Sequence, residues 1–261
     1  MKIGLCTSID NAALAADAGF DFIEENVQNL LVPEQPDEIF APKLKALRVA
    51  PLPAIAANCF LPAALKCTGP EVDAARLDRY AATALRRARE SGMRHIIFGS
   101  GGARQIPEGF PRAEAREQYL AFLRRLAPMA EAENVVVLIE SLNKKECNFM
   151  NPLAEAAAFV EEVAHPHLLM MADTYHMSVD GEAPEEIVKY ARWIQHIHIA
   201  ELEGRAAPGT HGEDFAPFLH ALKEINYQGG ISFECIWQDL PAQAAGSLKS
   251  FRAQLRLAGL G

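Results

Sequence analysis

The chain alternates two kinds of segment along its length, and this alternation limits the possible fold more than any other feature. Short runs of apolar and β-branched residues, typical of buried strands, are each followed by a segment with apolar residues at helical spacing. Eight such pairs fit within the 261 residues. The strands are expected at 2–6, 20–25, 54–60, 95–98, 135–140, 168–173, 194–198 and 230–234.

The expected helices follow these strands. The clearest covers 72–91, where apolar residues recur on one face and Gly92 follows its end. Segments 26–36 and 99–111 are expected to be loops, because they lack helical periodicity and carry proline or glycine. The helices are expected at 10–17, 42–47, 72–91, 112–133, 151–163, 184–190, 214–225 and 243–257.

Alternating strands and helices with short connections indicate right-handed crossovers and a parallel sheet. Eight units in about 250 residues is the number that closes a (β/α)8 TIM barrel. The alternative is an open doubly wound sheet, but the GxGxxG turn of a dinucleotide-binding fold is missing after the first strand. We therefore expect a single TIM barrel domain over residues 1–261.

Composition excludes several classes of partner. The net charge of −9 argues against a nucleic-acid or anionic-membrane surface, which usually needs a basic stripe. A signal-peptide core and a run of about 20 apolar residues are both lacking, so a cytoplasmic location is expected. The cysteines are odd in number and lack CxxC spacing, which indicates reduced core thiols. They are Cys6, Cys59, Cys67, Cys147 and Cys235.

Four of the expected strands end in a potential metal ligand. The stretch VVVLIE ends in Glu140, and the three later strands end in Asp173, His198 and Glu234. In a barrel all carboxyl ends of the strands open on one face, so these side chains are expected to converge. Three crowded carboxylates repel one another unless a cation offsets them. The donor set suits Mn²⁺, Mg²⁺ or Co²⁺ better than a structural Zn²⁺ site; alternatively, each acidic residue caps a helix or pairs with an arginine.

Further polar residues are expected in loops over the same face. Glu146 and His176 follow the fifth and sixth strands, and Arg205 lies in the loop after the seventh, where barrels often hold substrate oxyanions. Taken alone, each of them is equally typical of an ordinary surface or loop residue without a functional role. His196 points to the same side of its strand as His198, and we expect it to be a hydrogen-bonded core histidine.

Taken together, these segments resemble the xylose isomerase-like TIM barrel family of sugar and sugar-phosphate isomerases and epimerases. Within it, the ketose 3-epimerases of the D-tagatose 3-epimerase type are most similar. Two details depart from the pattern: Lys144 stands where an arginine is often seen, and Arg205 lies one residue further from His198 than expected. The motifs are IESLNKKECNF from Ile139, ADTYHM from Ala172, HIHIAE from His196, SFEC from Ser232, and the loop from Arg205 to Gly212.

The resemblance implies a role for each candidate residue. Glu140 and Glu234 would also act as the catalytic acid and base. The residues that would hold substrate oxygens are Glu146, His176 and Arg205. The residues that would bind a divalent metal ion, most commonly Mn²⁺ with Mg²⁺, Co²⁺ or Zn²⁺ as alternatives, are Glu140, Asp173, His198 and Glu234.

The implied reaction is removal and return of a proton beside a ketone through a metal-stabilised cis-enediolate. Return to the other face of the same carbon epimerises it, and delivery to the neighbouring carbon isomerises the sugar. Hydroxypyruvate isomerase and an inosose dehydratase-type lyase are alternatives with the same metal site. A DNA-repair endonuclease would need more histidines and a basic groove, and a sugar-binding module would not need two opposed glutamates. The expected partner is a small sugar or hydroxycarbonyl compound, and a homodimer or homotetramer is compatible with exposed barrel helices.

Overall fold

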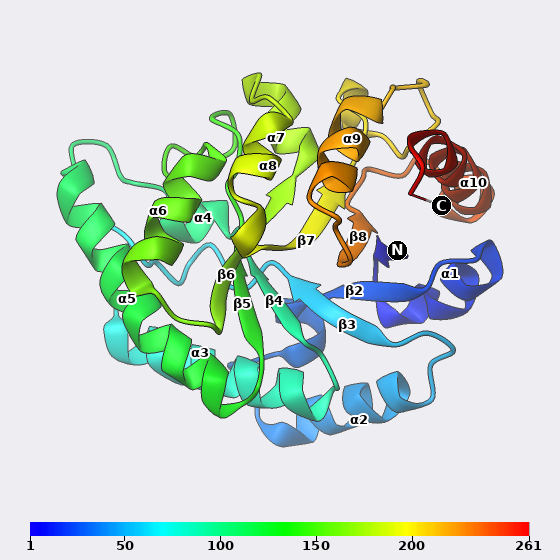
Figure 1. The fold of residues 1–261 in the computed structure, drawn as a ribbon. Coiled ribbons are helices and arrows are strands. Elements are labelled where there is room, and N and C mark those ends of the chain that lie inside the picture. The colour runs from blue at the N-terminus through cyan, green and yellow to red at the C-terminus, as the bar shows by residue number, and fades with distance from the viewer. Residues whose placement is uncertain (261) are drawn as a thin grey trace.

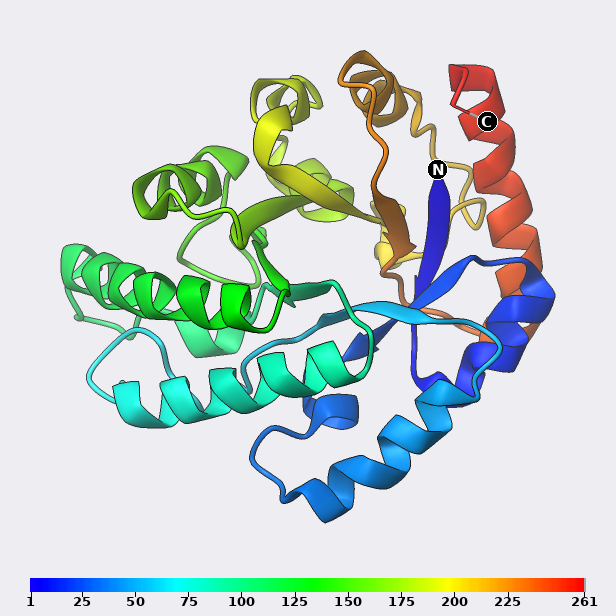
Figure 2. The same ribbon diagram turned by 60° about the horizontal axis from the view of Figure 1, so that its bottom comes forward.

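The computed structural model describes residues 1–260, which form a closed barrel of eight parallel strands surrounded by helices (Figures 1 and 2). The strands follow one another around the barrel in chain order, and β1 closes it against β8. The predicted TIM barrel is therefore confirmed. The strands are β1 (Lys2–Cys6), β2 (Phe22–Asn26), β3 (Ala54–Asn58), β4 (His95–Phe98), β5 (Val136–Ile139), β6 (Leu168–Asp173), β7 (Ile194–Ile199) and β8 (Gly230–Phe233).

The helices form the outer ring. All eight expected helices are present, with ends that differ from the prediction by a few residues. Five longer ones are α2 (Asp37–Arg48), α3 (Ala74–Glu90), α5 (Arg112–Ala132), α6 (Leu153–Val163) and α10 (Leu240–Ala258). The shorter ones are α1 (Ala12–Ala18), α4 (Gly101–Arg104), α7 (Thr174–Asp180), α8 (Glu185–Lys189) and α9 (Ala216–Glu224), with single turns η1 (Ile9–Asn11), η2 (Val27–Leu31), η3 (Ala191–Trp193) and η4 (Glu203–Arg205).

Four local predictions were wrong. The segments expected to be loops contain η2 and α4, and α2 begins at Asp37 rather than at Pro42. Asp37 stabilises this earlier start because it lies in the first turn and pairs with Arg86 and Arg87 of α3. Helix α7 was missed, although its sequence carries both end signals: Asp173 caps its first turn, and Gly181 ends it in the left-handed conformation.

Two apolar regions stabilise the barrel. The larger one lies between strands and helices, and a small cluster of Ile97, Leu138 and Met171 forms a separate group. Another part of the barrel interior is polar: Glu24, His196 and Ser232 are all buried and joined by hydrogen bonds. These three polar residues lie between the barrel interior and the carboxyl ends of the strands.

The cysteines are free thiols in the described part of the chain, but only some of them are core residues. Cys67 and Cys147 are buried as expected, whereas Cys59 is exposed and Cys6 and Cys235 are half-buried. The last three stand at or just after the carboxyl ends of β3, β1 and β8, where the barrel opens. Among residues 1–260, no helix is both long and apolar enough to cross a membrane.

Candidate metal centre and active site

The four strand-end residues predicted from the sequence lie around one point at the barrel mouth. The imidazole of His198 stands at the centre of this group. Its Nδ1 atom lies 3.3 Å from Glu140 Oε1, 3.4 Å from Glu234 Oε2 and 4.0 Å from Asp173 Oδ2. The strand ends bring them together because Asp173 and His198 are in register on neighbouring strands, and Glu140 and Glu234 directly follow β5 and β8.

Two atoms of this group are buried without a hydrogen-bond partner among the described residues. They are Glu140 Oε1 and His198 Nδ1, which lie close together but not in hydrogen-bond geometry. A buried polar atom without a partner costs roughly 1–3 kcal/mol, so such atoms call for a ligand. Three carboxylates and an imidazole form a donor set that suits a hard or borderline divalent cation. The residues present therefore fit a metal ion.

His176 also reaches this group, but not from a loop as predicted. It lies in the first turn of α7, is 3% exposed, and has its Nε2 atom 3.5 Å from Asp173 Oδ2. Its Nδ1 accepts a hydrogen bond from Asn143 Nδ2 at 2.7 Å. By distance alone, His176 groups with Glu140, Asp173 and Glu234 as a potential ligand. The Nδ1 lone pair of His176 is already used by Asn143. His198 is therefore the better imidazole ligand for a metal ion.

Arg205 and Glu146 lie at the rim, as predicted for residues that contact substrate. The Arg205 guanidinium forms a close ion pair with Glu234, lies 3.3 Å from Asp173 Oδ2 and 3.5 Å from Glu146 Oε1, and stacks over the Tyr175 ring at 4.7 Å. Arg205 adopts a left-handed backbone conformation with φ of 49° in η4. The Arg205 guanidinium is thus a cation held close to the carboxylates of the site.

The two glutamates differ in electrostatic environment. Burial raises the pKa of Glu140 above its usual range. Burial would also raise the pKa of Glu234, but the His198 imidazole and the Arg205 guanidinium lower it to about 2. Neighbouring carboxyl groups with pKa values pushed apart are typical of an acid and base pair. The two carboxyl groups of the site therefore differ in their tendency to hold a proton.

Three residues of the site were not predicted. Asn58, the last residue of β3, donates from Nδ2 to Glu234 Oε1 at 3.1 Å. Gly99 leaves room for Glu140, because a Cβ atom at this position would overlap Glu140 Oε2. Glu24 of β2 binds His198 from inside the barrel. The only sequence signal for Asn58 was a polar residue at a strand end.

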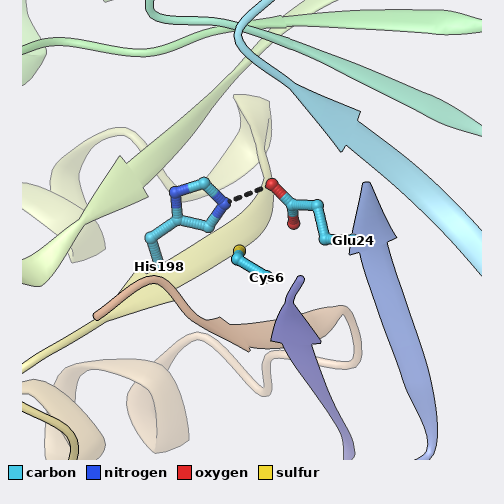
Figure 3. A group of neighbouring side chains, drawn as sticks. All are labelled: Cys6, Glu24 and His198. Carbon is cyan, nitrogen blue, oxygen red and sulfur yellow. Dashed lines mark hydrogen bonds and ion pairs between the residues drawn. The ribbon is translucent and has the colours of Figure 1, made fainter. Parts of the chain in front are cut away.

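Figure 3 shows Glu24 and His198 facing each other, with the Cys6 sulfur beside them. His198 donates from Nε2 to Glu24 Oε1 at 2.8 Å. Burial would raise the pKa of Glu24, but His198 and His196 hold it well below the usual range, so the carboxylate stays ionised. Burial and then Glu24 raise the pKa of the Cys6 thiol, which stays protonated. His196 donates from Nε2 to Glu24 Oε2 at 2.8 Å, which confirms the predicted hydrogen-bonded core histidine.

Comparison with known proteins finds named epimerases and isomerases among the proteins similar to this chain. The family profile described as Xylose isomerase-like TIM barrel matches residues 12–254. Over 143 residues the chain is 32% identical to an L-ribulose 3-epimerase from Methylomonas sp. (strain DH-1), which covers 49% of this chain and 50% of that protein. Over 149 residues it is 28% identical to a Mus musculus protein provisionally named as a hydroxypyruvate isomerase, covering 54% of this chain and 52% of the other.

A solved structure matches along nearly the whole chain. The crystal structure of a D-allulose 3-epimerase from Methylomonas sp. superposes with a TM-score of 0.83 at 28% identity, covering 98% of each chain. The sequence alignments themselves span only about half the length of the two relatives above. The likeness thus extends over the barrel and over the strand ends that carry the candidate ligands.

Proposed function

The chain belongs to the xylose isomerase-like TIM barrel family, and we propose from this premise that it is a divalent-metal-dependent ketose 3-epimerase. One observation carries the proposal: carboxylate oxygens of Glu140 and Glu234 lie 3.3 and 3.4 Å from His198 Nδ1, an atom without a hydrogen-bond partner among the described residues. A pair of carboxyl groups around one such point suits proton exchange on two faces of a small substrate. The similarity to an L-ribulose 3-epimerase supports the same class of reaction.

The metal ion would be held by the four strand-end side chains. When bound, a divalent cation supplies positive charge that stabilises the oxyanion developing on the substrate carbonyl. We favour Mn²⁺ because three carboxylates and one imidazole, without a thiolate, match its preferred ligands. The four side chains that would hold this ion are those of Glu140, Asp173, His198 and Glu234.

The chain's own residues would do the proton chemistry. One glutamate takes the C3 proton, and the electrons of that C–H bond move into an enediolate. The other glutamate returns a proton to C3 from the opposite side, which inverts this carbon. Arg205, Glu146 and His176 would hold hydroxyl and carbonyl oxygens, a role supported by the short distances from Glu146 to Arg205, 3.5 Å, and to His176, 3.8 Å. Both glutamates exchange roles in the reverse reaction.

Deuterium exchange tests this proposal directly. Incubation of the Mn²⁺-loaded enzyme with L-ribulose, D-psicose and D-tagatose in D₂O is expected to place one deuterium at C3 of substrate and product, because the proton returned comes from exchangeable carboxyl groups. Protein treated with a chelator serves as the control and should give no exchange. Unlabelled C3 across a broad ketose panel would sink the proposal.

Hydroxypyruvate isomerase is the second candidate, supported by the similarity to the Mus musculus protein. In that reaction the returned proton goes to the neighbouring carbon, so the carbonyl moves along the chain. Adding hydroxypyruvate to the panel separates the two: carbonyl migration favours the isomerase, and C3 inversion favours the epimerase. Loss of water from an inosose would instead indicate the dehydratase-type lyase.

Replacement of Gly99 by alanine is expected to lower kcat/KM about tenfold or more with little change in Tm. The new Cβ would overlap Glu140 Oε2, so the carboxylate must turn away from His198. Displacement of a catalytic group by about 1 Å can cost 10²-fold in rate, whereas a carboxylate tip moves at little cost in folding energy. Ketose epimerisation rates and thermal unfolding of the variant check this.

A matched control lies two residues away. Alanine at Gly101 would approach the tip of Leu142 at 3.0 Å, with the backbone oxygen of Glu146 at 3.4 Å and the Cβ atom of Cys147 at 3.5 Å, and none of these three nearest atoms belongs to a carboxylate. We expect this variant to keep near wild-type kcat/KM. If both variants lose activity equally, the effect belongs to the α4 turn as a whole and the proposed steric role of Gly99 is wrong.

A further inference from the structure

A buried polar array runs through the barrel interior behind the candidate metal centre. It joins Glu24 of β2 to two histidines of β7 and to Ser232 of β8, and all four side chains are 1% exposed or less. Glu24 Oε1 receives His198 Nε2 at 2.8 Å, and Glu24 Oε2 receives His196 Nε2 and the Ser232 hydroxyl, each at 2.8 Å. Both carboxylate oxygens are therefore held by donors.

We propose that Glu24 is the positioning residue of the metal centre: anchored by His196 and Ser232, it holds His198 with a proton on Nε2 and the Nδ1 lone pair turned toward Glu140, Asp173 and Glu234. This inference rests on the proposed metal-dependent function. Glu24 does not touch the candidate substrate site itself. It acts through His198, at the edge of the ring that carries Nε2 (Figure 3).

The geometry explains why an ionised carboxylate is needed at this place. A carboxylate accepts only, so the ring nitrogen facing Glu24 must carry the proton. In the neutral imidazole the opposite nitrogen then carries the lone pair that can bind a cation, and a carboxylate behind a metal-binding histidine commonly fixes its tautomer and raises its basicity. A ring flip would turn a carbon atom toward Glu24 and leave a buried carboxylate oxygen unpaired, which is costly.

The anchor on Oε2 gives the array its rigidity. His196 Nε2 lies 2.9 Å from Ser232 Oγ as well as 2.8 Å from Glu24, so the three groups form a closed triangle. His198 and Ser232 are in register on neighbouring strands, as are His196 and Gly230. The carboxylate position is thus set by three strands of the barrel rather than by one side chain, and this rigidity is transmitted to the His198 ring.

The neighbouring residue provides a matched control. Glu25 is also buried, at 3% exposure, but its carboxylate accepts hydrogen bonds from the backbone N–H groups of Ile9 and Asn26 on the other side of β2. No hydrogen bond or ion pair joins Glu25 to His198 among the described residues. The substitutions Glu24→Gln and Glu25→Gln therefore differ by one position and by one contact with the metal centre.

Calorimetric titration of the metal-free protein with Mn²⁺ tests the inference. Glu24→Gln is expected to weaken Mn²⁺ binding about 10- to 100-fold, the usual range for residues that support a metal ligand. Glu24→Asp should also lose affinity, because the shorter side chain withdraws the carboxylate from His198 while keeping its charge. Glu25→Gln should bind Mn²⁺ as the wild type does. In the Zn²⁺-loaded, ¹⁵N-histidine-labelled wild type, NMR should show a proton on Nε2 of His198.

Each outcome decides one point. Equal Mn²⁺ affinity of Glu24→Gln and wild type, or an Nδ1-protonated His198, overturns the positioning role while the proposed function stands. A wild type that binds no Mn²⁺ overturns the metal-dependent function and, with it, this inference. Should Glu24→Gln fail to fold, Ser232→Ala removes a single donor to Oε2 and is expected to weaken Mn²⁺ binding a few-fold; unchanged affinity there contradicts the anchoring array.

Discussion

Replacing Glu234 by glutamine is expected to lower kcat for ketose epimerisation about 10³-fold, within the range lost when a general acid or base is removed. The amide cannot take or give the C3 proton. Its oxygen can still accept the hydrogen bond from Asn58, which now reaches Glu234 Oε1 at 3.1 Å, so the local structure should persist. Ketose binding, measured by calorimetry, should fall far less than turnover.

The comparison between turnover and binding separates an enzyme from a binding module. A sugar-binding protein would lose ligand affinity and any residual turnover together, because the carboxylate would serve only as a contact. Glu203→Gln is the control, since this side chain is exposed in the same loop as Arg205 and its only ion pair within residues 1–260 is with His211, at 3.9 Å. It should leave both quantities near wild type. Equal losses of kcat and ketose affinity in Glu234→Gln would contradict the catalytic role.

The parts of the site that could be predicted are those fixed by strand order and strand ends. A parallel barrel places each strand's last residue at one mouth, so Glu140, Asp173, His198 and Glu234 could be placed from the chain alone. The substrate-contact prediction for Arg205 depended on the same rule. Convergence of these side chains is now supported by distances of 3.3 to 4.0 Å, while their roles stay predictions.

The remaining features depend on contacts that no local pattern encodes. Glu24 reaches His198 across the barrel interior, from a strand that does not pair with β7. A glycine is required at position 99 only because the side chain of Glu140, which directly follows the next strand, lies against it. His176 was placed in a loop because α7 is only seven residues long and lacks a clear apolar stripe, although its Asp173 cap could have revealed it. One residue, Asp173, thus ends a strand, caps a helix and belongs to the candidate metal centre.

Glutamine at position 140 is expected to weaken Mn²⁺ binding and proton transfer together. The loss of Mn²⁺ affinity should be at least about 100-fold, since even residues behind a ligand cost 10- to 100-fold. The kcat at saturating Mn²⁺ should fall a further 10²- to 10³-fold, because the amide cannot exchange a proton. The buried Glu140 Oε1, which has no hydrogen-bond partner among the described residues, is the atom that both roles would use. Calorimetry and kcat measured at several Mn²⁺ concentrations check the two losses separately.

The two losses need not occur together, which is why the measurement is informative. Full recovery of kcat when Mn²⁺ is raised would leave Glu140 as a ligand only, and unchanged Mn²⁺ affinity with low kcat would leave it as an acid or base only. Glu146→Gln supplies the contrast from the same loop: its carboxylate meets Arg205 at 3.5 Å and is largely solvent-accessible, so KM should rise while Mn²⁺ affinity stays constant. A carboxylate that both binds the metal ion and exchanges a proton is expected to change both quantities, and these are the two roles proposed for Glu140, whose Oε1 atom lies 3.3 Å from His198 Nδ1.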